Sequence, residues 1–249
     1  MKTVMITGCS SGFGLETARY FLARDWRVVA TMRTPRLDVL PPSDRLSVLA
    51  LDVTDPESVR KAVEAAGAID VLVNNAGIAA ASPAELTPMA TVREVFETNT
   101  FGTIAMTQAV APQFRQRKAG VVVNVSSSVT RTVYPLIAAY SASKAAVNAF
   151  TESMAIELKP FGVRLRLVLP GRSLETNFGE NGRSHMHGLD HEAYVGIVQK
   201  FFAMMGDTSS PLTHAQDVAE AVWRAATDPS SPMRIPAGAD AEAAAAEAR

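Results

Sequence analysis

The sequence predicts an α/β protein with a doubly wound parallel sheet and helices on both faces of that sheet. Short apolar, β-branched segments alternate with longer segments of helical periodicity, which is the pattern of repeated βαβ units. The predicted strands are almost uninterrupted apolar runs, as expected for strands buried on both sides. Of the 249 residues 47% are hydrophobic, and no Pro-, Gly- or Ser-rich linker divides them, so we expect one domain over residues 1–249.

Six strands can be placed in order along the chain, and we expect a sheet of about seven. They are KTVMIT (2–7), RVVATM (27–32), LSVLALDV (46–53), AIDVLVNN (68–75), GVVVNVSS (120–127) and VRLRLVLP (163–170). Breakers mark the connections, for example Thr54-Asp55-Pro56, where Thr54 or Asp55 can cap a helix whose first turn suits Pro56. The Ala-rich tail at about 239–249 is predicted to be helical with a frayed end.

Composition and charge restrict the class of partner. A formal net charge of −1 offers no basic field for nucleic acid or an anionic membrane, so we expect a small-molecule partner. No segment resembles a secretory signal or a membrane span, which predicts a cytoplasmic protein. The single cysteine, Cys9, excludes an intrachain disulfide and a cysteine-based metal site. His185, His187 and His191 form a loose cluster that we interpret as solvated rather than as a metal site.

A glycine-rich loop follows the first strand and leads into a helical segment. The stretch Thr7-Gly8-Cys9-Ser10-Ser11-Gly12-Phe13-Gly14 allows a sharp turn and a close approach of the backbone to a pyrophosphate. The free N–H groups and the dipole of the helix N-terminus favour negative charge there. Because the spacing is G-x-x-x-G-x-G rather than G-x-G-x-x-G, the strand–loop–helix context carries the inference of a dinucleotide site, and a purely structural turn remains the alternative.

The end of the second strand indicates which dinucleotide is expected. NAD sites of this architecture place an acidic residue about 20 residues past the glycines, whereas an arginine accommodates a 2′-phosphate. Here the strand ends at Arg33, with Arg36 shortly after and no acid at the strand end. The sequence therefore predicts NADP(H), with NAD as the less expected cofactor. Ser11 either donates to that phosphate or satisfies the turn.

A tyrosine and a lysine lie four residues apart at the start of the helical segment AAYSASKAAVNAFTESMAIEL. On a helix, Tyr140 and Lys144 share one face, so their polar tips can address the same point. A free tyrosine has a pKa of about 10, and a fixed ammonium nearby favours the phenolate. The pair is thus a candidate proton-transfer site, although the same residues are also ordinary on an amphipathic helix.

These segments together resemble the short-chain dehydrogenase/reductase family over nearly the whole chain. The motifs that follow the family's order and spacing are Thr7-Gly8-x-x-x-Gly12-x-Gly14, Asn74-Asn75-Ala76-Gly77, Asn99, Ser126-Ser127-Ser128, Tyr140-x-x-x-Lys144 and Pro170-Gly171. The stretches TGCSSGFG, ATMR and YSASKAA further resemble the NADP-linked hydroxysteroid and retinol dehydrogenase-like branch. The resemblance implies a Rossmann-type fold. It also implies a homodimer or homotetramer formed through the helices that carry Asn99 and Tyr140.

The resemblance assigns catalytic roles to four residues. Tyr140 is the general acid or base, and Lys144 both tunes it and holds the nicotinamide ribose. Ser127 hydrogen-bonds the substrate oxygen, and Asn99 holds a water that links Lys144 to solvent. Among three adjacent serines we choose Ser127, because its interval of 13 residues to Tyr140 and a proline at 135 fit the family.

The resemblance also places residues along the cofactor. Asp52 would contact the adenine amino group beside Val53, and the Asn74–Gly77 segment would run along the cofactor and steady the sheet. The residues predicted to bind cofactor are Gly8, Ser10, Ser11, Gly12, Phe13, Gly14, Arg33, Asp52, Val53, Asn75, Ala76, Gly77, Tyr140, Lys144, Pro170, Gly171 and Thr176.

One segment departs from the family's pattern. The family usually reads Pro-Gly-x-x-x-Thr after the sixth strand, whereas Pro170-Gly171-Arg172-Ser173-Leu174-Glu175-Thr176 is one residue longer. Either Thr176 or Ser173 is therefore expected near the carboxamide of the nicotinamide. Residues from about 172 to 212 are expected to form a variable substrate loop with a lid helix. Its apolar residues suggest a substrate wall, although we prefer to interpret them as core or subunit contacts: Phe178, Tyr194, Phe201, Phe202, Met204 and Met205.

The leading functional hypothesis is an NADP(H)-dependent oxidoreductase that interconverts a secondary alcohol and a ketone or aldehyde, without a metal. The alternative is a non-catalytic NADP(H)-binding regulatory or scaffold protein on the same fold. Such a protein would need the glycine loop and Arg33, but not Ser127 and Tyr140. An epimerase or dehydratase of the extended relatives is disfavoured because the short C-terminal region leaves little room for a sugar-nucleotide domain.

Overall fold

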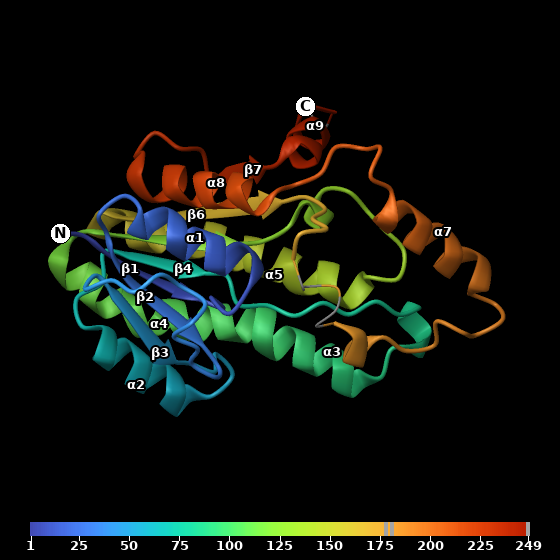
Figure 1. Cartoon of the computed structure of the whole chain (residues 1–249), viewed down its shortest axis with the longest axis horizontal. Coiled ribbons are helices and arrows are strands. Elements are labelled where there is room, and N and C mark those ends of the chain that lie inside the picture. Colours follow the sequence, from blue (N-terminus) through green and yellow to red (C-terminus); the bar gives the residue numbers. More distant parts are fainter. Residues whose placement is uncertain (177–178, 180–181, 248–249) are drawn as a thin grey trace.

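A computed structural model of the chain, which describes residues 1–176, 179 and 182–247, has the expected doubly wound architecture (Figure 1). Its seven-stranded sheet has the order β3-β2-β1-β4-β5-β6-β7, and all neighbouring strands pair in parallel. The strands are β1 (Thr3–Thr7), β2 (Arg27–Met32), β3 (Leu46–Ala50), β4 (Val71–Asn74), β5 (Gly120–Val125), β6 (Val163–Pro170) and β7 (Arg234–Ala237). The helices are α1 (Gly12–Leu22), α2 (Pro56–Ala66), α3 (Met89–Phe96), α4 (Gly102–Arg117), α5 (Ala138–Leu158), α7 (Val195–Gly206), α8 (Ala215–Thr227) and α9 (Ala239–Glu247).

The sheet separates two apolar layers. Successive side chains of a strand point to opposite faces, so Val4 and Ile6 pack with α1 and α8, whereas Met5 packs with α2 and α4. Figure 1 shows α1 and α8 on one side of the sheet and α2 and α4 on the other. Strands buried on both faces account for the uninterrupted apolar runs in the sequence.

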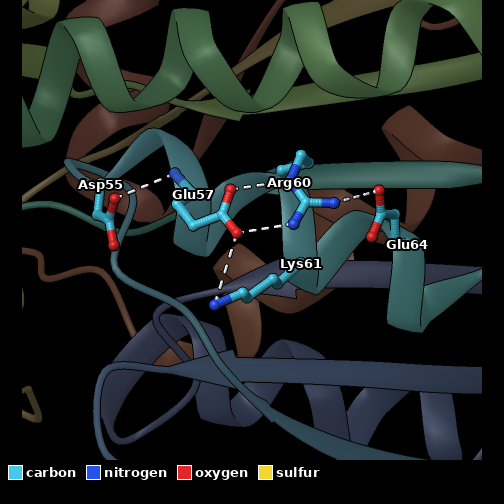
Figure 2. A network of polar contacts seen from close by, with 5 residues as sticks. All are labelled: Asp55, Glu57, Arg60, Lys61 and Glu64. Atoms are coloured by element: carbon cyan, nitrogen blue, oxygen red, sulfur yellow. Dashed lines mark hydrogen bonds and ion pairs between the residues drawn. The ribbon is translucent and has the colours of Figure 1, made fainter.

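The connection into α2 shows how local sequence fixes the start of an element. Of the two residues that could cap this helix, Asp55 does so, because its carboxylate accepts a 3.0 Å hydrogen bond from the Glu57 N–H. Figure 2 shows Arg60 bonded to Glu57 and to Glu64, while Lys61 adds an ion pair to Glu57. These ion pairs lie at the surface and contribute little to stability, so the buried face of α2 is what holds it to the sheet.

Helices α3 and α4 form one continuous rod with an irregular turn between them. A π-helical turn, Glu97–Phe101, joins the two, and it buries Asn99 completely. Such a turn inserts one extra residue into a helix and frequently lies at a functional site.

The order of the strands places the site. Strands are added outward from β1 toward β3 and then, from β4 on, on the other side of β1, so the strand order reverses between β1 and β4. Ligands of doubly wound folds bind at the carboxyl edge of the sheet beside such a switch point. The fold class predicted from the sequence is confirmed, whereas β7 was not located individually. Among the described residues, no helix is both long and apolar enough to cross a membrane.

Candidate active site

A cavity of about 1020 Å³ opens at the carboxyl edge of the sheet. Each of the first six strands contributes lining residues at or just beyond its carboxyl end. The predicted site residues that line it are Gly8, Ser10, Ser11, Gly12, Phe13, Arg33, Asp52, Val53, Asn75, Ala76, Gly77, Ser127, Tyr140, Lys144, Pro170, Gly171 and Thr176. Two predicted residues, Gly14 and Asn99, lie behind this wall.

The glycine loop forms part of the wall. Gly8 and Gly12 have φ angles of 75° and 56°, which side chains rarely adopt, so glycine is required at both positions. α1 begins at Gly12, and the Ser11 side chain that precedes it makes no capping hydrogen bond. The N–H groups of the first turn of α1 therefore remain available to an anion in the cavity.

Gly14 acts behind the loop. A Cβ atom at this position would lie 2.3 Å from the Gly8 carbonyl oxygen and 2.4 Å from the Asn75 amide nitrogen. The Asn75 amide group donates to the carbonyl oxygens of Thr7 and Gly8, at 2.9 and 3.2 Å. Gly14 thus permits the close packing that joins the glycine loop to the segment after β4. Its predicted contact with the cofactor stays a prediction, because Gly14 does not line the cavity and lies in the first turn of α1.

Asn74 and the Thr7 hydroxyl complete this junction. The Thr7 hydroxyl accepts hydrogen bonds from the N–H groups of Asn75 and Ala76, at 3.0 and 2.9 Å. The buried Asn74 amide donates to Asn124 of β5 and Thr107 of α4, so it ties the centre of the sheet to a covering helix.

Arg33 and Asp52 lie at the ends of β2 and β3. Arg33 is exposed and, within the described part of the chain, makes no ion pair, whereas Arg36 pairs with Asp38 at 3.3 Å. The guanidinium of Arg33 is therefore available to an anion. One Asp52 carboxylate oxygen accepts from the N–H and hydroxyl of Thr54, at 2.9 and 2.7 Å, which fixes the turn into α2.

The cavity is also lined by the predicted proton-transfer group, which consists of Tyr140, Lys144 and Ser127. The first two lie one turn apart in α5, and Ser127 follows β5 directly. Ser127 hydrogen-bonds to the Tyr140 side chain and accepts a 3.3 Å hydrogen bond from the Val129 N–H. The Lys144 ammonium donates to the Val125 carbonyl at 2.9 Å and lies 6.0 Å from the centre of the Tyr140 ring.

The neighbouring serines have other contacts. Ser126 is buried and donates to the Asn148 side chain at 2.6 Å, and Ser128 begins a short helical turn. Ser127, the serine chosen from the sequence, hydrogen-bonds to the tyrosine, and its catalytic role stays a prediction.

Burial shifts the pKa values of the pair. Burial raises the pKa of Tyr140 to about 12, and the Ser127 hydrogen bond opposes this rise. Burial also lowers the pKa of Lys144 to about 8. The sequence predicted that the lysine ammonium lowers the tyrosine pKa. Burial sets the direction of the Tyr140 pKa in the structure, so the expected effect of Lys144 on it stays a prediction.

Asn99 does not line the cavity itself but hydrogen-bonds to Ile78, which does. Its amide donates to the Ile78 carbonyl and to the Ser143 hydroxyl, each at 3.0 Å, and its oxygen accepts from the Ile78 N–H at 2.8 Å. A Cβ atom on Gly77 would lie 3.1 Å from the Asn99 oxygen and 3.5 Å from the Lys144 nitrogen. Asn99 thus fixes the backbone beside the lysine.

The longer loop after β6 also lines the cavity. Thr176 lies against the glycine loop, since a Cβ atom on Gly12 would approach its side chain to 3.2 Å. The Ser173 hydroxyl oxygen is buried at the cavity and has no hydrogen-bond partner among the described residues. An orphaned buried hydroxyl is costly, so Ser173 is the better placed of the two for a ligand amide.

The apolar residues of the lid region serve two purposes. Phe201, Phe202 and Met205 of α7 line the cavity, while Phe201 is also buried in a small apolar cluster that Met205 packs against, so the preferred core assignment is confirmed for Phe201. The spacing of these three residues puts them on one helix face. Tyr194 instead hydrogen-bonds to Glu85, and Met204 is exposed and does not line the cavity. Phe178 lies outside the described residues.

The histidine cluster does not gather around one point. His185 pairs with Glu94 at 3.1 Å, His187 with the Thr91 hydroxyl at 3.0 Å, and His191 accepts from a nearby N–H. Within the described ranges, no three His, Cys, Asp or Glu side chains are placed to hold a metal ion.

Comparison with known proteins decides the family. The family model described as short chain dehydrogenase matches residues 2–186. This chain is a short-chain dehydrogenase. It is 38% identical over 239 residues to the uncharacterized oxidoreductase YusZ of Bacillus subtilis, covering 91% of this chain and 85% of that protein. It is 34% identical over 257 residues to human retinol dehydrogenase 8, covering 94% and 80%.

Solved structures of short-chain dehydrogenases agree in fold. A short-chain dehydrogenase from Streptomyces avermitilis superposes with a TM-score of 0.85 at 31% identity, covering 99% of this chain and 91% of that one. One from Burkholderia cenocepacia in complex with NADP has a TM-score of 0.78 at 28% identity, covering 99% and 93%. A 3-ketoacyl-(acyl-carrier-protein) reductase from Brucella melitensis complexed with NADH has a TM-score of 0.77 at 27% identity, covering 94% and 96%. Family membership makes this short-chain dehydrogenase an oxidoreductase.

Sequence analysis missed part of the cavity wall. The missed lining residues include Ala79, Ala80, Ala81, Arg172, Ser184 and His185. The three alanines and Arg172 come shortly after predicted motifs, so their place in the chain was a usable signal. The others, together with Met186, come from the loop before α7, where no periodic pattern indicates which side chains turn inward.

Proposed function

We propose that this short-chain dehydrogenase is an NADP(H)-dependent enzyme that interconverts a secondary alcohol and a ketone or aldehyde. The observation that carries the proposal is that two sets of residues line the same cavity. One set is the glycine loop with Arg33, and the other is Ser127, Tyr140 and Lys144. A protein that only bound the cofactor would need the first set but not two hydroxyl groups that can meet a substrate oxygen.

The residues present fit a dinucleotide. We assign the pyrophosphate to the glycine loop and the first turn of α1, where positive-φ glycines leave the backbone open. Asp52 and Val53 would hold the adenine end and Arg33 the 2′-phosphate. The nicotinamide end would lie against Lys144 and the Pro170-Gly171 turn, where the orphaned Ser173 hydroxyl offers a partner to the carboxamide. When bound, the nicotinamide supplies the hydride in reduction and accepts it in oxidation.

Side chains of the protein donate and accept the proton. In reduction Tyr140 donates its proton to the carbonyl oxygen, and in oxidation the phenolate takes it back. The raised pKa of Tyr140 keeps the phenol protonated near neutral pH, which is the form that reduction needs. Ser127 stabilises the negative charge that develops on the oxygen, and the Lys144 ammonium favours the phenolate that remains. Asn99 serves as a positioning residue, because its side chain holds the backbone of Ile78.

Cofactor consumption tests this proposal. The purified protein is incubated with NADPH or NADH and a panel of ketones, quinones, retinal and steroid ketones, and absorbance at the reduced-nicotinamide band is followed. Turnover with NADPH supports the proposal. Tight NADPH binding without reduction of any carbonyl would instead favour a binding protein.

Replacing Arg33 with alanine is expected to weaken the binding of NADPH more than the binding of NADH. Loss of a charge-assisted bond to a phosphate should raise the KM for NADPH by at least about tenfold, whereas the KM for NADH should change little. Arg36→Ala is the matched control, because Arg36 is already paired with Asp38 and does not line the cavity. Equal losses with both cofactors in Arg33→Ala would remove the 2′-phosphate assignment.

Reduction is also expected to slow at alkaline pH. Because the pKa of Lys144 is lowered to about 8, the ammonium is present below that pH and is lost above it. The kcat/KM for NADPH, which reports the protein before the cofactor binds, should therefore fall above about pH 8 with the slope of a single proton. A profile that stays flat to pH 10 would show that this proton is not required.

A further inference from the structure

Arg172 connects the cavity loop to a distant helix. It directly follows the Pro170-Gly171 turn and lines the cavity. Its guanidinium donates two hydrogen bonds of 2.8 Å to the carbonyl oxygens of Met204 and Met205. These carbonyls belong to the last turn of α7, where a helix leaves its oxygens without partners and carries partial negative charge. A cation suits that position.

The backbone of Arg172 is held independently of its side chain. Its N–H donates to the Asp240 carboxylate of α9 at 2.6 Å, and the other Asp240 oxygen accepts from the Thr213 hydroxyl at 2.6 Å. The Gly171 N–H donates to the same hydroxyl at 2.9 Å. The loop is thus fixed to the C-terminal part of the sheet, so the guanidinium extends from a firm base.

Helix α7 has few other attachments. Figure 1 shows it standing apart from the helices that cover the sheet. Of its 12 residues, all of them described, only Phe201 is buried, where it packs with Ala81 and Leu136. At its N-terminal end, an exposed hydrogen bond of 2.7 Å joins Tyr194 to Glu85. At its C-terminal end, the two bonds from Arg172 add to the apolar contacts that Phe201 and Met205 make in that apolar cluster.

The same helix supplies the apolar wall of the cavity. Phe201, Phe202 and Met205 face the space that Tyr140 also lines. The position of this wall determines how much space a substrate has beside the reacting oxygen. Arg172 contacts the helix that forms the wall, and it does so from the loop that is proposed to hold the nicotinamide end.

We propose that Arg172 is a positioning residue that holds α7 against the cavity and so determines the affinity for substrates with a bulky apolar body. This inference rests on the proposed function. A small ketone does not need the wall, whereas a large one gains its binding energy from it. Losing the Arg172 bonds should therefore affect KM for large ketones, with kcat and cofactor binding nearly unchanged.

The kinetic test compares Arg172→Gln with Glu175→Gln. Glu175 lies on the same loop but ties it to the start of α8, accepting from His214 at 2.6 Å and from the Ala215 N–H at 3.1 Å. Arg172→Gln is expected to raise the KM for a steroid-sized ketone by about tenfold and to leave the KM for a small ketone and for NADPH within about twofold. Arg172→Lys should restore part of the loss. An equal effect of Glu175→Gln would show that general loosening of the loop is responsible, and would overturn the proposal.

Hydrogen exchange gives a readout that does not depend on activity. In the cofactor-free protein, the amides of α7 should exchange at least about tenfold faster in Arg172→Gln than in the wild type, while those of α5 remain unchanged. Unchanged exchange in α7 would contradict the proposal. If the wild type reduces no carbonyl, the proposed function fails, yet the exchange result still decides whether Arg172 holds α7.

Discussion

Replacing Tyr140 with phenylalanine is expected to lower kcat for ketone reduction by about 10²–10⁴-fold, the contribution typical of a general acid. The substitution removes the hydroxyl that hydrogen-bonds to Ser127 and leaves the ring beside the Lys144 ammonium. Cofactor affinity should therefore change much less than kcat. The measurement is steady-state NADPH oxidation with a ketone that the wild type reduces, together with NADPH titration by fluorescence.

Tyr134 provides the matched control for that experiment. It also lines the cavity, so Tyr134→Phe removes a second phenolic hydroxyl from the same space. In the proposed mechanism this hydroxyl transfers no proton, and its loss should have a far smaller effect on kcat. Comparable losses in the two variants would indicate that cavity polarity, rather than proton transfer from Tyr140, governs the rate.

Replacing Gly14 with alanine is expected to have the largest effect on the fold around the site. The new Cβ would lie 2.3 Å from the Gly8 carbonyl oxygen, a backbone atom that can move only if the glycine loop moves. Overpacking of this kind should cost about 3 kcal/mol and lower Tm by roughly 10 °C. Since the glycine loop would be displaced, NADPH binding should weaken as well. Thermal unfolding and NADPH titration measure the two effects.

Gly196→Ala is the control for this substitution. Gly196 lies in α7, and a Cβ atom there would meet nothing within 4 Å. Because alanine is the better helix former, Tm should stay the same or rise slightly. If Gly14→Ala left both Tm and NADPH affinity at their wild-type values, the close packing between α1 and the glycine loop would have no energetic importance.

Features fixed by local sequence could be predicted. α5 spans Ala138–Leu158, as its apolar pattern indicated, and this places Tyr140 and Lys144 on one face. The glycine loop lies between a strand and a helix because its residue types permit little else. β7 was not located from the sequence because it has only four residues and contains a proline, which is acceptable only at the edge of a sheet.

Features that depend on burial or on distant contacts could not be predicted. The spacing of Tyr140 and Lys144 indicated proximity, but the direction of the tyrosine pKa depends on how much water the fold excludes. The extra residue after Pro170-Gly171 left Ser173 and Thr176 as equal candidates, and only their positions against the cavity and Gly12 separate them. The inward face of α7 likewise depends on where the helix packs, and its sequence pattern alone fits several environments.

The π-helical turn between α3 and α4 has a consequence for how the chain tolerates changes in length. Each residue advances an α-helix by about 100° of rotation. A π-helical turn takes up its extra residue by winding with more residues per turn, so deleting one residue within Glu97–Phe101 would restore a regular helix and leave α4 in phase with α3. A deletion in the first turn of α4 would instead rotate the residues that follow it, and Met106, Val110 and Phe114, which are completely buried, would turn away from the core. The turn is thus a place where the rod can lose a residue and keep its core face, with the loss falling on the contacts that Asn99 makes to Ile78.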